Sequence, residues 1–107
     1  MANSNKSLHE YLMADIFAQI DGISSKNMFG GFGYYKNGKI FGIVADGKLY
    51  FKTHEGNKKN FEELGSQPFV YRSHKGKKVS MSYYELPENV MEDREVLEAW
   101  IEESINR

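Results

Sequence analysis

Two dipeptides in the middle of the chain, Asn37-Gly38 and Asp46-Gly47, constrain its fold more than any other feature. Each suits the two-residue loop of a β-hairpin, because such a loop needs positive φ at both central positions. The apolar residues around them predict three consecutive antiparallel strands, over Met28–Lys36, Lys39–Ala45 and Lys48–Thr53. A chain with two such turns in succession is restricted to folds that contain an antiparallel meander.

Helical patterns precede and follow this meander. Apolar residues recur every four positions up to Ile20, which predicts a first helix with Ser7 as its N-cap and Glu10 completing a capping box. Gly22 is the expected stop of this helix. A second, short helix is predicted over Asn57–Leu64.

The C-terminal part predicts a second hairpin and a last helix. The segments "PFVYRS" and "KVSMSYYEL" read as strands around Lys75-Gly76, and Pro87 ends the second strand. Asp93 is the expected cap of the last helix. Its predicted buried face comprises Val96, Leu97, Trp100, Ile101, Ser104 and Ile105. The predicted order α-β-β-β-α-β-β-α makes residues 1–107 a single α+β domain.

The stretch "KNMFGGFGYY" gathers glycines in the first predicted strand. A phosphate-binding loop would place them before a helix, but a strand and a turn follow, so a structural role is favoured. The turns predict that Gly33 opposes Gly42, and that Gly42 opposes Phe51, with Gly31 on the same face. This face, with Phe29, Tyr35, Ile40, Val44 and Leu49, is expected to be the core face. The Phe51 ring would then lie across bare glycine backbone. The alternative is a ligand-binding surface made by Gly31, Gly33, Gly42 and Phe51.

Composition narrows the function classes. The 107 residues include no cysteine, which excludes disulfides and thiolate chemistry. We see neither a signal peptide nor an apolar run near the roughly 18 residues of a spanning helix, so a cytoplasmic location without membrane contact is expected. Residues 1–84 hold 12 Lys/Arg and 7 Asp/Glu, whereas residues 85–107 hold 2 and 8. This division suits an anionic partner or a homodimer, or it reflects a solvated acidic helix.

No constellation typical of catalysis is apparent. The three histidines, His9, His54 and His74, lack metal-ligand spacing, and no serine stands in a G-x-S-x-G motif. We therefore expect no catalytic residue, no metal site and no cofactor. The hairpin tip "RSHKGKK" is a candidate contact for anions or nucleic acid through Arg72, Lys75, Lys77 and Lys78. The alternative is a lysine-rich tip that opposes edge-to-edge aggregation.

Three segments carry a specific resemblance. The stretches "MFGGFGYYKNGKIFGIVADGKLYFK", "GSQPFVYRS" and "MSYYELP" resemble the TfoX N-terminal domain family in order and spacing over nearly the whole chain. The matching positions are Met28, Phe29, Gly30, Gly31, Gly33, Tyr35, Asp46, Leu49, Tyr50, Lys52, Pro68, Phe69, Met81, Ser82, Tyr83, Tyr84 and Pro87.

The resemblance implies a curved antiparallel sheet with helices, like that of small secretion-chaperone-like domains. It also implies a non-enzymatic bacterial domain that regulates transcription of competence genes through a protein partner, such as the transcription machinery. Full-length regulators of this kind carry a further helical domain that looks like a nucleic-acid-binding module. We expect this chain alone to contact DNA only weakly or indirectly. The alternative function is a module that binds a small molecule or a peptide on the glycine face.

Overall fold

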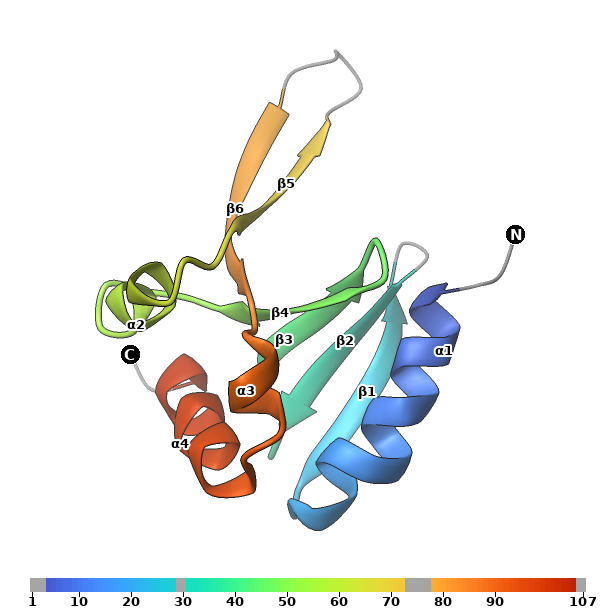
Figure 1. Cartoon of the computed structure of the whole chain (residues 1–107). Coiled ribbons are helices and arrows are strands. Elements are labelled where there is room, and N and C mark those ends of the chain that lie inside the picture. Colours follow the sequence, from blue (N-terminus) through green and yellow to red (C-terminus); the bar gives the residue numbers. More distant parts are fainter. Residues whose placement is uncertain (1–3, 29–30, 73–77, 106–107) are drawn as a thin grey trace.

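The computed structural model describes residues 4–28, 31–72 and 78–105 (Figure 1). Its helical elements are α1 (Ser4–Tyr11), η1 (Leu12–Ile16), η2 (Phe17–Gln19), α2 (Lys58–Glu63), α3 (Glu88–Met91) and α4 (Arg94–Ile105). Its strands are β1 (Ile23–Met28), β2 (Gly31–Lys36), β3 (Lys39–Ala45), β4 (Lys48–Lys52), β5 (Pro68–Arg72) and β6 (Lys78–Glu85). The predicted α+β class is confirmed.

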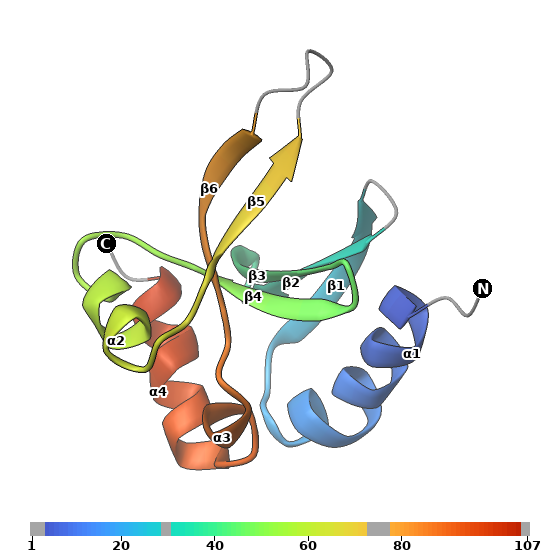
Figure 2. The ribbon, with the colours of Figure 1, turned by 45° about the horizontal axis from the view of Figure 1, so that its top comes forward.

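The strands form one antiparallel sheet in the order β1-β2-β3-β4-β6-β5. Both predicted hairpin turns are confirmed, because φ is 52° at Asn37, 85° at Gly38, 54° at Asp46 and 73° at Gly47. All described helices pack on one side of this sheet, and the β5–β6 hairpin extends away on the other side (Figure 2). The sheet therefore has one face covered by helices and one that no described helix covers.

The predicted order of elements lacks two that the structure contains, β1 and α3. The sequence of β1, "ISSKNM", has no apolar alternation and was not predicted as a strand. It is the edge strand of the sheet, bonded only to β2, and such a position tolerates polar residues on both faces. The helix α3 is a single turn that follows Pro87, its N-cap residue.

The first helix differs from the prediction in both its start and its pitch. It begins at Ser4, so Ser7 lies inside α1 and is not the N-cap. A π-helical turn, η1, follows, in which the Phe17 N–H donates to the Leu12 carbonyl. Because a π turn spans five residues, Leu12 and Phe17 both enter the core, whereas Ile16 is only partly buried. The expected four-residue spacing therefore fails at this point.

A β-bulge in β3 overturns the predicted register of the glycines. Lys36 opposes Lys39 as predicted, but Tyr34 opposes Gly42 and Tyr35 opposes Ile40, which leaves Phe41 as an extra residue. A bulge of this kind re-aims the side chains around it. Gly33 consequently opposes Ile43 instead of Gly42. The residues of β2, and those of β3 before Phe41, therefore lie on the opposite face of the sheet from the one predicted.

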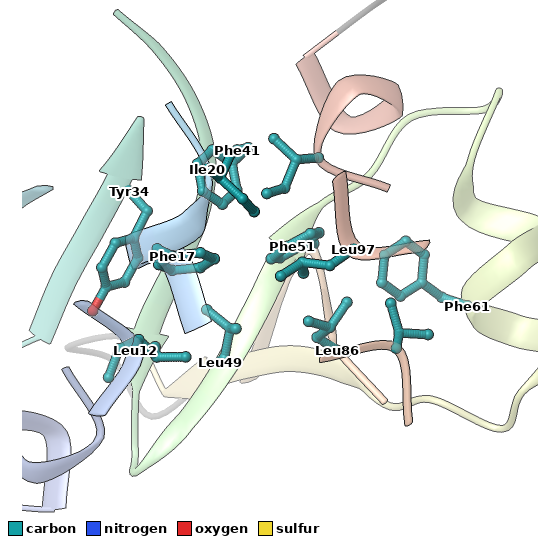
Figure 3. Packing of buried hydrophobic residues seen from close by; sticks show 13 residues of the cluster. Leu12, Phe17, Ile20, Tyr34, Phe41, Leu49, Phe51, Phe61, Leu86 and Leu97 are labelled. Atoms are coloured by element: carbon teal, nitrogen blue, oxygen red, sulfur yellow. The ribbon is translucent and has the colours of Figure 1, made fainter. Parts of the chain in front are cut away.

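The core lies between the sheet and the helices (Figure 3). Phe41 is buried and packs against the rings of Phe17 and Phe51, with ring centroids 5.6 and 5.3 Å away. The buried cluster consists of Leu12, Phe17, Ile20, Tyr34, Phe41, Val44, Leu49, Phe51, Phe61, Leu86, Val90, Leu97 and Ile101. The prediction placed Tyr35 in the core, but its neighbour Tyr34 holds that place. Phe29 lies outside the described residues.

Helix α4 closes the core and joins α2. Asp93 caps it as predicted, because its Oδ1 accepts a hydrogen bond from the Val96 N–H at 3.3 Å. The buried side chain of Asn57 connects three elements: Oδ1 accepts from the His54 N–H (2.8 Å), and Nδ2 donates to the Lys52 carbonyl (3.2 Å) and to Ser104 Oγ (3.4 Å). This polar link fixes the start of α2 against β4 and α4.

Candidate functional site

The predicted glycine surface is divided between the two faces of the sheet. Gly42 and Phe51 form a cross-strand pair on the helix-covered face. A Cβ added at Gly42 would lie 3.2 Å from Cδ1 of Phe51, so the ring lies against bare glycine backbone as predicted. Gly31 and Gly33 lie on the other face, so the prediction of a common core face for these glycines was wrong.

The helix-free face is built from alternate residues of five strands. Cross-strand pairs join Lys26 to Gly33, Gly33 to Ile43, and Ile43 to Tyr50 in one row. A Cβ added at Gly33 would lie 2.5 Å from Cε of Met28, so a methionine thioether covers this glycine in place of the expected phenylalanine ring. Lys52 and Tyr83 form a further pair at the β4–β6 junction.

Two partly exposed tyrosines mark this face. The Lys26 ammonium lies 5.5 Å from the centroid of the Tyr35 ring, a cation–π contact. Burial raises the pKa of Tyr83, and the neighbouring Tyr35 hydroxyl contributes a smaller rise. The sequence analysis did not identify Lys26 and Tyr83 as site residues. It assigned Tyr35 to the core because nothing in the amino-acid sequence indicates the bulge that places Tyr35 on the other face.

Tyr50 closes the same face at the base of the β5–β6 hairpin. Its ring centroid lies 4.9 Å from that of Phe69, and it is buried. Burial raises the pKa of Tyr50, and the carboxylates of Glu85 and Asp46 raise it further. This tyrosine is therefore a packing residue, whereas Tyr35 and Tyr83 remain partly accessible.

Charge is segregated between the two layers of the described molecule. The strands contain one acidic residue, Glu85, and seven basic ones: Lys26, Lys36, Lys39, Lys48, Lys52, Arg72 and Lys78. The helical elements contain four basic residues, Lys6, Lys58, Lys59 and Arg94, and nine acidic ones: Glu10, Asp15, Glu62, Glu63, Glu88, Glu95, Glu98, Glu102 and Glu103. The division expected along the sequence thus becomes a basic sheet and an acidic helical layer.

The helical layer also leaves apolar side chains in solvent. Leu64 is 52% exposed at the end of α2, and Val96 is 37% exposed on α4, although Val96 was predicted to be buried. Trp100, one turn after Val96, is half-buried with its ring centroid 4.7 Å from that of Phe61. Asn60 Nδ2 also donates to Glu103 at 3.0 Å, so α2 and α4 contact each other through both the Asn60–Glu103 bond and the Phe61–Trp100 ring pair. We call Leu64, Val96 and Trp100 the α2–α4 patch.

The basic hairpin is described only in part. Arg72 and Lys78 form the last backbone pair of β5 and β6. Lys75 and Lys77 lie outside the described residues, so the predicted contact with anions stays a prediction. Both views show this end of the hairpin on the side of the molecule away from α4 (Figures 1 and 2). The acidic residues of α4 are therefore not arranged around the last pair of the hairpin.

The two histidines in the described part of the chain, His9 and His54, make hydrogen bonds that hold the fold together. The Tyr34 hydroxyl and His9 Nδ1 form a 2.8 Å hydrogen bond inside the α1–sheet interface, and the imidazole stacks on Phe32 at 3.9 Å. His54 Nε2–H donates to the Glu103 carbonyl at 2.6 Å, and Nδ1 accepts from the Gly56 N–H at 3.0 Å. Within the described residues no three His, Asp or Glu side chains group as metal ligands.

No helix of the described chain has the length and apolar character needed to cross a membrane. No curated protein matches the sequence. The model of the TfoX N-terminal domain matches residues 15–107, which is most of the chain. The chain belongs to the TfoX N-terminal domain family, a family of competence-related regulatory domains.

Proposed function

We propose that this chain is a non-enzymatic regulatory domain that acts in competence-gene transcription by binding another protein through the α2–α4 patch. Family membership supports the regulatory part of this proposal. The observation that carries the choice of surface is the exposure of Leu64 and Val96 on a layer that is otherwise acidic.

The patch has the composition of a protein-binding surface. Apolar side chains that lie close together in solvent, with polar residues around them, are typical of contact sites. Trp100 adds a half-buried aromatic ring one turn after Val96, and such residues dominate binding energies when a partner buries them. Glu63, Glu95 and Glu103 are exposed on the same two helices, so the partner surface should combine apolar anchors with lysine or arginine.

The test is quantitative affinity capture from the native cell, followed by binding measurements with the purified partner. The double variant Leu64→Ser/Val96→Ser removes exposed apolar groups without opening the core. We expect it to weaken binding at least tenfold, about 1.4 kcal/mol, because interface residues of this kind commonly contribute that much.

A matched control is available on the first helix. Tyr11 is 46% exposed on α1, away from the patch, so Tyr11→Ser should leave the partner bound. The proposal fails if the double variant binds the partner as well as the wild type, or if Tyr11→Ser weakens binding equally. Transcription from a competence promoter should fall in parallel with binding in the double variant.

A further inference from the structure

We propose that the helix-free face of the sheet binds single-stranded nucleic acid without sequence preference, in a contact separate from the α2–α4 patch. The juxtaposition that carries this proposal is a basic strand layer that presents two partly exposed tyrosines, Tyr35 on β2 and Tyr83 on β6, beside the lysines Lys26 on β1 and Lys52 on β4.

The charge of the face selects an anionic ligand. Lys26 and Lys52 project from β1 and β4, and neither has a carboxylate partner among the described residues, whereas Lys48 is paired with Glu85 at 3.9 Å. Carboxylates gather instead on the helical layer behind the sheet. An anion therefore meets attraction on the sheet and repulsion on the helices, which orients its approach.

The spacing of the lysines selects a chain of phosphates over a single anion. β1 and β4 are separated by three strand spacings, which amounts to about 14 Å at roughly 4.8 Å each. No single phosphate or carboxylate spans that interval. A polymer with repeated phosphates crosses it, and it contacts both lysines while it lies over the strands.

The tyrosines select nucleic acid over an acidic peptide, and single strands over duplex. Tyr35 and Tyr83 are half-buried on the face that no described helix covers, so each ring has accessible surface. Bases stack on such rings in a sequence-tolerant manner, and open sheets that carry aromatic residues are a recurring platform for unpaired bases. Duplex bases are stacked inside the helix and cannot use these rings.

At Gly33 the backbone carries no side chain that would hinder the approach of a base. Gly33 lies between Lys26 and Ile43 in the same row, and the nearest side-chain atoms over it belong to the Met28 thioether and the Tyr35 ring. A methionine side chain is flexible and shifts readily when a flat ring arrives. Gly33, which was predicted to lie in the core, therefore contributes no side chain to this face, two residues before Tyr35 on the same strand.

The experiment measures fluorescence anisotropy of a labelled oligothymidine of about 15 nucleotides, longer than most single binding sites of roughly 4–16 nucleotides. We expect binding to the oligothymidine and at least fivefold weaker binding to a duplex of equal length. Raising salt from about 50 to about 200 mM should weaken single-strand binding roughly tenfold. The reason is that two or three phosphate contacts release counterions on binding, and this release is less favourable at higher salt.

Variants divide the contributions. Tyr35→Leu and Tyr83→Leu should each raise Kd at least fivefold, whereas Tyr35→Phe and Tyr83→Phe keep the ring and should stay within twofold of the wild type. Lys26→Gln and Lys52→Gln should each raise Kd at low salt and lower the salt dependence. Lys59→Gln is the matched control, because Lys59 is an exposed lysine on α2.

Three results would overturn the proposal. These are equal or tighter binding to duplex, equal effects of Lys59→Gln and Lys26→Gln, and full competition by polyglutamate at equal charge concentration. Circular dichroism establishes that each variant is folded, and the lysine variants test the face even if a leucine variant unfolds. Loss of partner capture by Leu64→Ser/Val96→Ser with retained oligothymidine binding would show that the two contacts are separate.

Discussion

The two faces of the sheet use neighbouring residues of the same strands for different purposes. On the helix-covered face, Tyr34 is fully buried and bonded to His9. One residue later, Tyr35 stands on the helix-free face beneath the Lys26 ammonium. Residue type alone therefore does not assign a tyrosine to the core or to the surface of this sheet. The bulge at Phe41 decides which of two adjacent tyrosines enters the core.

The same contrast extends to charge and packing. The helix-covered face holds the aromatic cluster around Phe17, Phe41 and Phe51, where every ring has ring neighbours (Figure 3). The helix-free face holds lysines, a methionine and partly exposed tyrosines. The helix-covered face therefore holds the core that stabilises the domain, and the helix-free face carries the charged and partly exposed side chains.

The largest expected effect is that of Phe41→Ala. Phe41 is buried at the bulge between the rings of Phe17 and Phe51, and such truncation leaves a cavity that costs about 3–5 kcal/mol of unfolding free energy. Tyr35→Ala, on the helix-free face, should cost only about 1 kcal/mol. Urea denaturation of both variants checks the comparison. Similar losses in the two variants would contradict the assignment of the two faces.

The sequence predicted what depends on local chemistry. The turns at Asn37-Gly38 and Asp46-Gly47 follow from residues that tolerate positive φ, and the Asp93 cap follows from a side chain that bonds its own helix. The Phe51 ring against Gly42 also follows, because only the second turn fixes that pair. The α+β class follows from these local elements in order.

Features that depend on tertiary packing were not predicted. The bulge at Phe41 and the π turn before Phe17 each insert one residue, and both bring a phenylalanine into the core at the expense of regular spacing. A regular period read from the sequence contains no sign of such insertions. The helix-free face was therefore missed: Gly31, Gly33 and Tyr35 were placed in the core, and Lys26 and Tyr83 were not assigned to a binding surface.

The second prediction compares two glycines on opposite faces. A Cβ at Gly42 would meet the Tyr50 carbonyl oxygen at 2.8 Å and the Phe51 ring at 3.2 Å, so Gly42→Ala should cost about 1–3 kcal/mol. The atoms nearest to a Cβ at Gly33 are Cε of Met28 at 2.5 Å, Sδ of Met28 at 3.4 Å and Cε1 of Tyr35 at 3.6 Å. Because that methionine moves easily, Gly33→Ala should cost less than about 1 kcal/mol. Thermal unfolding ranks the two, and the opposite ranking would refute the register.

The third prediction concerns alkaline pH. In the unfolded chain a tyrosine titrates near pKa 10, whereas burial raises the pKa of Tyr34 far above this value in the folded state. The stability from its neutral hydroxyl is therefore complete below about pH 10. It falls as the pH rises toward the folded pKa, by at most about 1.4 kcal/mol per pH unit.

Tyr34→Phe is the variant that isolates this contribution. It loses the hydrogen bond to His9, about 0.5–1.5 kcal/mol at every pH, but it should lose less additional stability than the wild type above about pH 10. Urea denaturation at several alkaline pH values gives the two slopes. Parallel curves for wild type and variant would show that Tyr34 does not titrate differently in the folded state.

The smallest expected effect lies where the basic sheet meets the acidic helices. Lys36 Nζ at the end of β2 lies 2.7 Å from Glu102 Oε2 on α4, and their side chains are 15% and 48% exposed. The Lys48–Glu85 pair joins two strands at 3.9 Å and is more exposed on its lysine side. Double-mutant cycles with glutamine should give a coupling of about 0.5–1 kcal/mol for the first pair and less than about 0.5 kcal/mol for the second. Both couplings should shrink in about 1 M salt, where the Debye length falls to roughly 3 Å. A larger coupling energy for Lys48–Glu85 than for Lys36–Glu102 would contradict this ranking. It would mean that the ion pair within the sheet contributes more to stability than the ion pair between the sheet and the helices.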